Sequence, residues 1–191
     1  MELFIDNFLP TLFLDDDFVC LQSCFCLLRL MLKYHDPQVC YILSNAGVSP
    51  ELYATPWFFT YFSQKCDNIN LVVELWLRLI HCRENTMSQQ FNNYCNTGLN
   101  IFTLSIALII HHRQQILLSD NSNLPGCMAG LSIQNMDDLE NVCRIASELY
   151  ETTPISFWQS DEIQILFGEN SKTFYKQLPR HSKIEMHLRL E

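Results

Sequence analysis

Apolar residues recur at intervals of three and four positions through most of this chain, and no other feature constrains its fold as strongly. That spacing places them on one face of a helix. Between residues 18 and 34, for example, the polar residues Gln22, Arg29 and Lys33 share one helical face and apolar residues fill the remainder. Only 5 glycines and 7 prolines interrupt the 191 residues, which favours helices over a turn-rich β fold. We therefore predict an all-α fold.

Start and stop signals set the expected helix boundaries. Pro37 suits a first helical turn, Gly47 suits the position after a last one, and Asn135 precedes two aspartates as a helix cap would. A polar loop is expected over 83–98 and a connector over 120–130. The helix at 69–82 is expected to have a narrow exposed face. The expected helices cover residues 18–34, 37–45, 50–62, 69–82, 99–118 and 136–150.

The charge balance argues against nucleic acid as a partner. Lys and Arg number 12 against 21 Asp and Glu, a formal net charge of -9, whereas a nucleic-acid binder needs a basic face. The tail at 172–191 is the exception, with five basic residues and two acidic ones. That tail is compatible either with a solvated end or with peripheral contact to anionic lipid.

Cysteine usage and the chain start both indicate a reducing, cytoplasmic setting. Nine cysteines cannot all pair within one chain, and their spacing is not that of a disulfide framework. Glu2 and Asp6 stand where a secretion signal would carry positive charge. The longest apolar run, residues 99–110, falls well short of the ~20 residues that span a bilayer, so we predict no transmembrane segment.

Chemistry-bearing patterns are weak. Cys24 and Cys26 are the closest cysteine pair, and a helix would point them to different faces, which disfavours a zinc site. The adjacent His111 and His112 fit a dipole or capping role near a helix end. His35 and Asp36 could be imagined as base and orienter for a cysteine nucleophile, but adjacent residues rarely meet that geometry. No glycine-rich phosphate loop occurs. We expect no catalytic residue, no metal and no cofactor.

Two stretches carry a more specific signal. Residues 27–37 end in a Tyr-His-Asp-Pro corner, and residues 48–62 contain a Pro-x-x-Tyr-Ala-x-x-Trp pattern, followed later by Leu-Trp. Together they resemble the second half of a TBC domain, the all-helical domain of Rab GTPase-activating proteins. The resemblance implies a helical C-terminal lobe of a TBC-type domain, in which buried aromatic side chains lock consecutive helices together. The marker residues, expected to be structural, are Tyr34, His35, Asp36, Pro37, Pro50, Tyr53, Ala54, Trp57, Leu75 and Trp76.

Residues 133–154 narrow the resemblance further. They are similar to the segment that leads out of the TBC domain in the branch where a rhodanese-like domain follows, a branch of trans-Golgi vesicle-capture adaptors. The likeness covers about residues 21–168. We therefore divide the chain into a lead segment (1–20), a TBC-like helical lobe (21–158, with a polar insertion at 83–98), and a linker with a basic tail (159–191).

The catalytic motifs of that family do not precede the matching segment. An active TBC domain supplies an arginine finger from Ile-x-x-Asp-x-x-Arg and a glutamine from Tyr-x-Gln, both in its first half, to stabilise the transferring phosphoryl group and orient water. Neither motif lies before residue 21. Arg29 falls after the position of both, and Leu77 replaces the Asp of the family's Leu-Trp-Asp. The resemblance therefore implies a protein that is not itself an enzyme.

The resemblance implies a noncatalytic Rab-GAP-like adaptor in endosome-to-Golgi vesicle trafficking and tethering. Its expected partners are golgins, vesicle machinery and a Rab GTPase, at a cytoplasmic, peripheral location on the trans-Golgi network or endosomal vesicles. One alternative is a fragment of an active Rab GTPase activator whose arginine-finger half is missing. Another is a helical interaction fragment with no surviving role, which would tend to aggregate through uncovered apolar surface.

Overall fold

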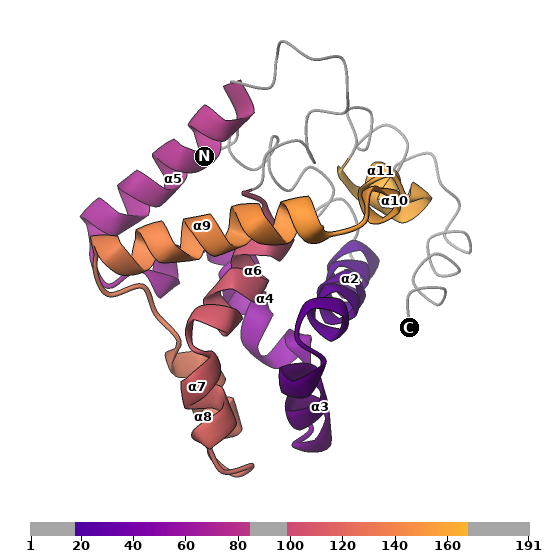
Figure 1. Cartoon of the computed structure of the whole chain (residues 1–191), viewed down its shortest axis with the longest axis vertical. Coiled ribbons are helices and arrows are strands. Elements are labelled where there is room, and N and C mark those ends of the chain that lie inside the picture. Colours follow the sequence, from indigo (N-terminus) through magenta and orange to yellow (C-terminus); the bar gives the residue numbers. More distant parts are fainter. Residues whose placement is uncertain (1–17, 85–98, 168–191) are drawn as a thin grey trace.

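The computed structural model describes residues 18–84 and 99–167, and every regular element in these ranges is a helix. A single isolated parallel bridge, Cys66 to Ile133, joins two loops without forming a strand. The predicted all-α fold is therefore confirmed. The elements, with the labels of Figure 1, are α2 (Val19–His35), α3 (Pro37–Asn45), α4 (Pro50–Thr60), the 3-10 turn η1 (Ser63–Lys65), α5 (Ile69–Glu84), α6 (Ile101–His111), α7 (Arg113–Leu118), α8 (Leu124–Gly130), α9 (Met136–Thr152), α10 (Ile155–Trp158) and α11 (Asp161–Phe167).

Several helices begin where their capping residues indicate. The Asp36 carboxylate accepts a hydrogen bond from the Val39 backbone N–H at 3.1 Å, and Pro37 occupies the first turn of α3. Gly47 follows α3 with a φ of 69°, a left-handed conformation that glycine adopts without steric cost. At α9 the Asn135 side chain accepts from the Asp138 backbone N–H at 2.9 Å. Local chemistry therefore fixes these helix ends.

Helix α6 is the centre of the fold, and residues 101–109 along it are all buried. It packs most extensively against α9, which crosses it in Figure 1, and also contacts α2 and α4. Its buried start is satisfied reciprocally, because Asn100 accepts from the Thr103 backbone N–H at 3.1 Å and the Thr103 hydroxyl accepts from the Asn100 N–H at 3.0 Å. The Ser105 hydroxyl donates to the Ile101 carbonyl at 2.7 Å, so this polar side chain is also paired.

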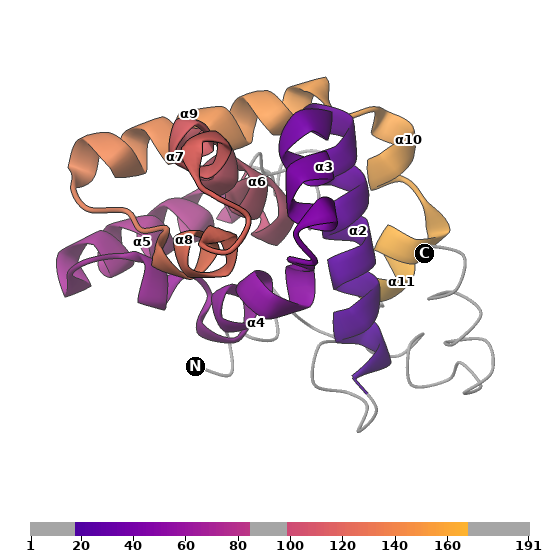
Figure 2. The ribbon, with the colours of Figure 1, turned by 90° about the horizontal axis from the view of Figure 1, so that it is seen from below.

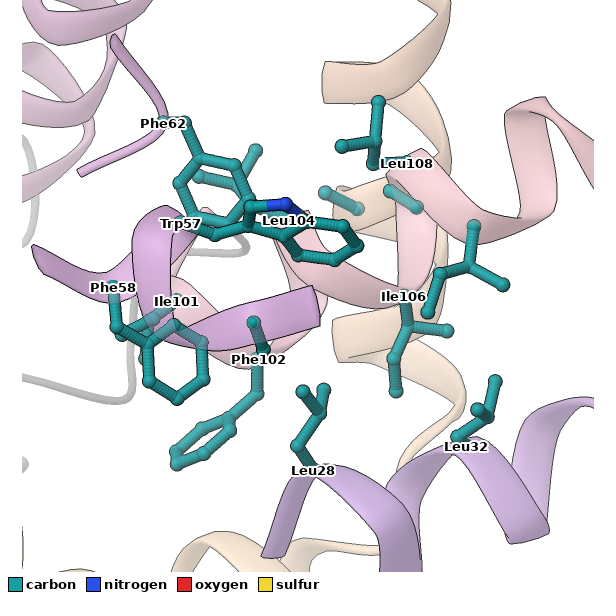
Figure 3. Packing of buried hydrophobic residues seen from close by; sticks show 14 of the residues in the cluster. Leu28, Leu32, Trp57, Phe58, Phe62, Ile101, Phe102, Leu104, Ile106 and Leu108 are labelled. Atoms are coloured by element: carbon teal, nitrogen blue, oxygen red, sulfur yellow. The ribbon is translucent and has the colours of Figure 1, made fainter. Parts of the chain in front are cut away.

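The hydrophobic core forms where α2 and α4 meet α6 (Figure 3). The rings of Phe25 and Phe58 stack with centroids 5.5 Å apart, which joins α2 to α4. Burial of such aromatic side chains is the largest favourable contribution to a core of this kind. The residues labelled in Figure 3 are Leu28, Leu32, Trp57, Phe58, Phe62, Ile101, Phe102, Leu104, Ile106 and Leu108.

The single helix expected over 99–118 is wrong, because the chain bends at His112 and begins a new helix, α7, at Arg113. The imidazole Nε2 of His112 lies 2.8 Å from the Ser132 carbonyl oxygen, and His111 is 3.0 Å from the Asn141 amide nitrogen. His112 is the C-cap of α6 and His111 lies in its last turn, as expected, and both side chains also contact distant segments. These contacts, together with packing of α7 on α3 and α8, outweigh the local preference for one straight helix.

Two further segments hold helices where connecting chain was expected. Helix α8 lies inside the predicted connector at 120–130, with Leu124 and Met128 fully buried, and α11 lies beyond Trp158, where the sequence pattern weakens. Short helices of this kind carry too few periodic positions to be recognised from spacing alone. The expected loop over 83–98 and the basic tail fall outside the described residues, apart from the last two residues of α5.

Helix α5 lies at one edge of the fold (Figure 1), and its exposed face is broad where a narrow one was expected. Leu71, Leu75 and Leu79 form its buried side, whereas Ile69 is 70% exposed and Val73 is 49% exposed. The difference arises because α5 packs mainly against α9 and lacks covering elements on its other side in the part of the chain that is described.

Candidate functional site

The corner between α2 and α3 holds the first group of marker residues. Asp36 is 6% exposed, caps α3, and also accepts a hydrogen bond from Arg113 Nε at 2.7 Å. Arg113 in turn donates from Nη2 to Gln38 Oε1 at 2.7 Å. Pro37 starts α3 and is exposed. The Asp36 carboxylate is thus committed to structural contacts at both oxygens.

His35 is directed away from Asp36. Its Nε2 lies 2.7 Å from the Thr153 hydroxyl, and that hydroxyl donates its one hydrogen to the Leu149 carbonyl at 2.7 Å. His35 must therefore be the donor through Nε2–H. Burial lowers the pKa of His35 below its ordinary value of 6.5, which favours the neutral ring. The structure does not bring His35 and Asp36 together as a base and its orienter.

The neighbouring Tyr34 is 60% exposed, and its ring meets the His35 ring edge-on with centroids 4.9 Å apart. Most of the Tyr34 side chain therefore lies in solvent, whereas His35 is partly buried and Asp36 is buried. The corner is accordingly built on a buried acid and presents an exposed phenol.

The second group of marker residues forms an aromatic cluster in α4. Trp57 is completely buried, with the ring of Tyr53 5.1 Å away and that of Phe62 6.1 Å away. The Lys65 ammonium lies 5.7 Å from the Trp57 ring centroid and donates to the Ala129 carbonyl at 2.6 Å. Burial lowers the pKa of Lys65 and raises that of the Tyr53 phenol. Pro50 and Ala54 of α4 are also buried.

The last marker pair lies in α5. Leu75 is fully buried, and Trp76, which is partly buried, donates from its indole N–H to the Tyr61 carbonyl at 3.0 Å. This bond joins α5 to the end of α4. Leu77, which replaces the family's Asp, is 49% exposed and faces away from these contacts. The marker residues thus make packing, capping, hydrogen-bond and ion-pair contacts, with Tyr34 and Pro37 exposed, and their value as family markers stays a prediction.

Two residues outside the sequence-based set prove to be tied into this region. Arg113 reaches Asp36 across 77 positions of sequence, and Lys65 closes the aromatic cluster over Trp57. No local pattern signals either contact, because each joins residues from different helices. A surface arginine after an apolar helix offers no more than a general hint of pairing.

The described residues hold no cluster of three or more His, Cys, Asp or Glu that could bind a metal ion. Burial raises the pKa of Cys24 well above its ordinary value and that of Cys66 to about 11, so neither thiol is a thiolate at neutral pH. None of the helices in the described ranges is long and apolar enough to cross a membrane. The geometry of the described residues defines an all-helical lobe.

Comparison with known families agrees with this class. Residues 1–117 match the RabGAP-TBC family, described as the Rab-GTPase-TBC domain. This chain therefore belongs to the Rab-GTPase-TBC domain family. The match begins ahead of the predicted lobe start at residue 21 and includes α2 to α6.

Known relatives carry the same family name. A "TBC domain-containing protein kinase-like protein" of Gallus gallus is 32% identical over 156 residues, which cover 82% of this chain and 16% of that protein. The Dictyostelium discoideum protein of the same name is 24% identical over 156 residues, covering 82% and 13%. The Homo sapiens protein is 32% identical over 80 residues, covering 42% and 9%. The chain therefore spans less than a fifth of the length of these relatives.

The resemblance to the adaptor branch and the catalytic glutamine motif can both be compared with these findings. The relatives' names describe a kinase-like protein and mention neither a rhodanese-like domain nor the Golgi. The sequence does contain one Tyr-x-Gln triplet, Tyr175 to Gln177, but it lies C-terminal to the family match and outside the described residues. That position is not where the family places its catalytic glutamine.

Proposed function

We propose that this chain is the helical lobe of a noncatalytic Rab-GAP-like adaptor module that acts in endosome-to-Golgi vesicle trafficking and tethering. Membership of the Rab-GTPase-TBC family supports a Rab GTPase as one partner class. The resemblance of residues 133–154 to the adaptor branch supports golgins and vesicle machinery as the others. On this proposal the module works at the cytoplasmic face of trans-Golgi or endosomal membranes and binds by surface complementarity.

The late position of Arg29 in the sequence and the engagement of the other described arginines carry the noncatalytic part of this proposal. An arginine finger needs a guanidinium that is free to reach the transferring phosphoryl group. Arg29 is exposed on α2, well after the family's arginine-finger position in sequence. The other described guanidinium groups are held by carboxylates: Arg78 by Glu74, Arg113 by Asp36, and Arg144 by Glu148.

The experiment that tests the proposal starts with the native protein. Its transcript is read through both ends, its mass is measured in cells, and the purified protein is then assayed with a panel of GTP-loaded Rab proteins. We expect binding to at least one Rab without faster GTP hydrolysis. Upstream sequence that carries the Ile-x-x-Asp-x-x-Arg motif, together with faster hydrolysis, would overturn the noncatalytic proposal.

A second candidate is a piece of an active Rab GTPase activator whose arginine-finger half lies elsewhere in the protein. The apolar stripe of α5 favours this reading, because Ile69, Val73, Leu77 and Ile80 share one helix face and are 38–70% exposed. Such a stripe indicates a surface that another element covers. Joining the chain to the first half of the domain would bury this stripe, which hydrogen exchange of α5 in the native protein would detect.

A further inference from the structure

A groove runs between the outer faces of α2 and α3, and its smaller end reaches Pro50 and Tyr53 of α4. Figure 2 shows α3 lying alongside α2. The larger part of the groove has a volume of about 350 Å³, and a smaller hollow of about 160 Å³ lies beside it, with Arg29 lining both. We call these two hollows together the α2–α3 groove. Its lining includes Arg29, Leu30 and Lys33 of α2 and Pro37, Tyr41 and Ser44 of α3.

The groove combines positive charge with exposed apolar surface. Arg29 and Lys33 stand one helical turn apart and are both exposed. Leu30 is 47% exposed and Tyr41 is 67% exposed on the facing helix. None of the described residues that line either hollow is acidic. In a chain whose formal net charge is -9, this is a locally basic and apolar surface.

The two cations differ from the other cations whose side chains are described. Lys65 donates to a carbonyl oxygen, and the three remaining arginines pair with carboxylates. Arg29 and Lys33 have no such partner among the described residues. Two like charges at i and i+4 also disfavour a helix by about 0.2–0.5 kcal/mol. Lys33 lies in the last turn of α2, where the helix dipole favours a positive charge and offsets part of that cost. The dipole does not explain why a hollow adjoins the two cations.

We propose that the α2–α3 groove binds an acidic, amphipathic segment of a partner protein. Carboxylates of that segment would pair with Arg29 and Lys33, and an apolar side chain would enter the hollow beside Leu30 and Tyr41. Charge-assisted hydrogen bonds supply orientation, and apolar burial supplies affinity. The inference rests on the proposed function, since it names the partner class that the adaptor module binds.

Other occupants fit the charges less well. Recognition of anionic lipid by basic clusters takes about four to eight Lys or Arg, and the groove offers two. The acidic body of the chain would also repel an anionic membrane. A second copy of the chain carries the same net negative charge, which opposes close approach. An acidic peptide segment with apolar residues is complementary to both features of the groove.

A peptide selection tests the proposal on the full chain. A phage-displayed random 16-residue peptide library is selected on the wild-type protein. Enriched peptides are then titrated against the double variant Arg29→Glu with Lys33→Glu, and against Arg144→Glu as the matched control for an exposed arginine on α9. We expect enriched peptides to combine Asp or Glu with Leu or Phe, and to lose at least tenfold in affinity for the double variant but not for the control.

Two further readings complete the test. Circular dichroism of each variant establishes that it folds, and Tyr41→Ala, which leaves the charges in place, should also weaken the enriched peptides. Enrichment of peptides without acids, unchanged affinity for the double variant, or no enrichment would overturn the proposal. Phosphatidylserine vesicles are titrated in parallel, and vesicle binding that depends on Arg29 and Lys33 in the absence of peptide binding would assign the groove to lipid instead. Faster Rab GTP hydrolysis would overturn the noncatalytic function and leave the peptide result standing.

Discussion

Arg113 donates a hydrogen bond to the carboxylate of Asp36 at 2.7 Å, and that carboxylate also caps α3. One acidic side chain therefore sets the start of a helix and joins it to α7, which is far away in sequence. The Asp36 side chain is 8% exposed, whereas that of Arg113 is 33% exposed. Little water reaches the Asp36 carboxylate, so its negative charge depends on Arg113 for stabilisation. The corner that resembles the family's signature is a structural junction.

Two substitutions of Asp36 should separate the contribution of its charge from that of its helix cap. Asp36→Asn keeps a capping oxygen but removes the charge, and we expect it to lower the free energy of unfolding by about 1 kcal/mol. Asp36→Ala removes the cap as well, and we expect a loss of about 2 kcal/mol. Urea denaturation measures both. Asp120→Asn, at an exposed aspartate, is the control and should change stability by less than about 0.5 kcal/mol. Equal losses for Asn and Ala would contradict the separate roles.

Trp57 should be the most costly single position in α4. It is fully buried among Tyr53 and Phe62, so Trp57→Ala should cost about 3–5 kcal/mol through lost burial and the cavity left behind. Leu52→Ala in the same helix is the matched control, because Leu52 is 65% exposed. We expect a change of no more than about 0.5 kcal/mol there. Thermal unfolding of the two variants checks the difference, and similar midpoints would show that α4 is oriented differently.

Acidification should weaken the fold partly through His35. Burial lowers the folded-state pKa of His35 below 6.5, so between that pKa and 6.5 the unfolded chain binds more protons than the folded chain. The free energy of unfolding should therefore fall as the pH drops through this window. His35→Gln retains a donor for Thr153 and removes the titration, so its stability should depend less on pH. If the stability of His35→Gln falls with decreasing pH as steeply as that of the wild type, other groups cause the pH dependence. His111 is one such group, because burial also lowers its pKa.

The α5 stripe should promote self-association of the isolated chain. Val73→Lys and Leu77→Lys place charge on this exposed apolar face without touching the buried side of α5. We expect both to reduce higher-mass species in sedimentation velocity and to leave the fold intact. Leu118→Lys is the control, since Leu118 is 84% exposed on α7, away from the stripe. An isolated wild-type chain that is monomeric at every concentration measured would contradict this expectation.

The sequence predicted local features well and long-range contacts poorly. The helix at 37–45 was predicted with its observed bounds because Asp36, Pro37 and Gly47 all act within a few residues of its ends. The break at His112 was not, because the contact that favours it is made to Ser132 in another segment. Helix periodicity also overstated the burial of α5, since periodicity describes which face is apolar and not whether a neighbour covers it.

The candidate site divides in the same way. The sequence placed marker residues such as Tyr53 and Trp57 in the core, where the structure also has them. It did not pair Asp36 with Arg113, and it gave no sign that Arg29 and Lys33 line a groove, because that groove exists only once α3 packs beside α2. The family resemblance in the sequence is supported by the family match, whereas its trafficking branch stays a proposal.

GTP hydrolysis by Rab proteins in the presence of the native protein tests whether the module is noncatalytic. Single-turnover hydrolysis is measured for each Rab that binds, with the protein in excess. We expect binding with an unchanged hydrolysis rate. Because an arginine finger accelerates hydrolysis by roughly 10³–10⁵-fold, an acceleration in that range would contradict the account and establish a working GTPase activator.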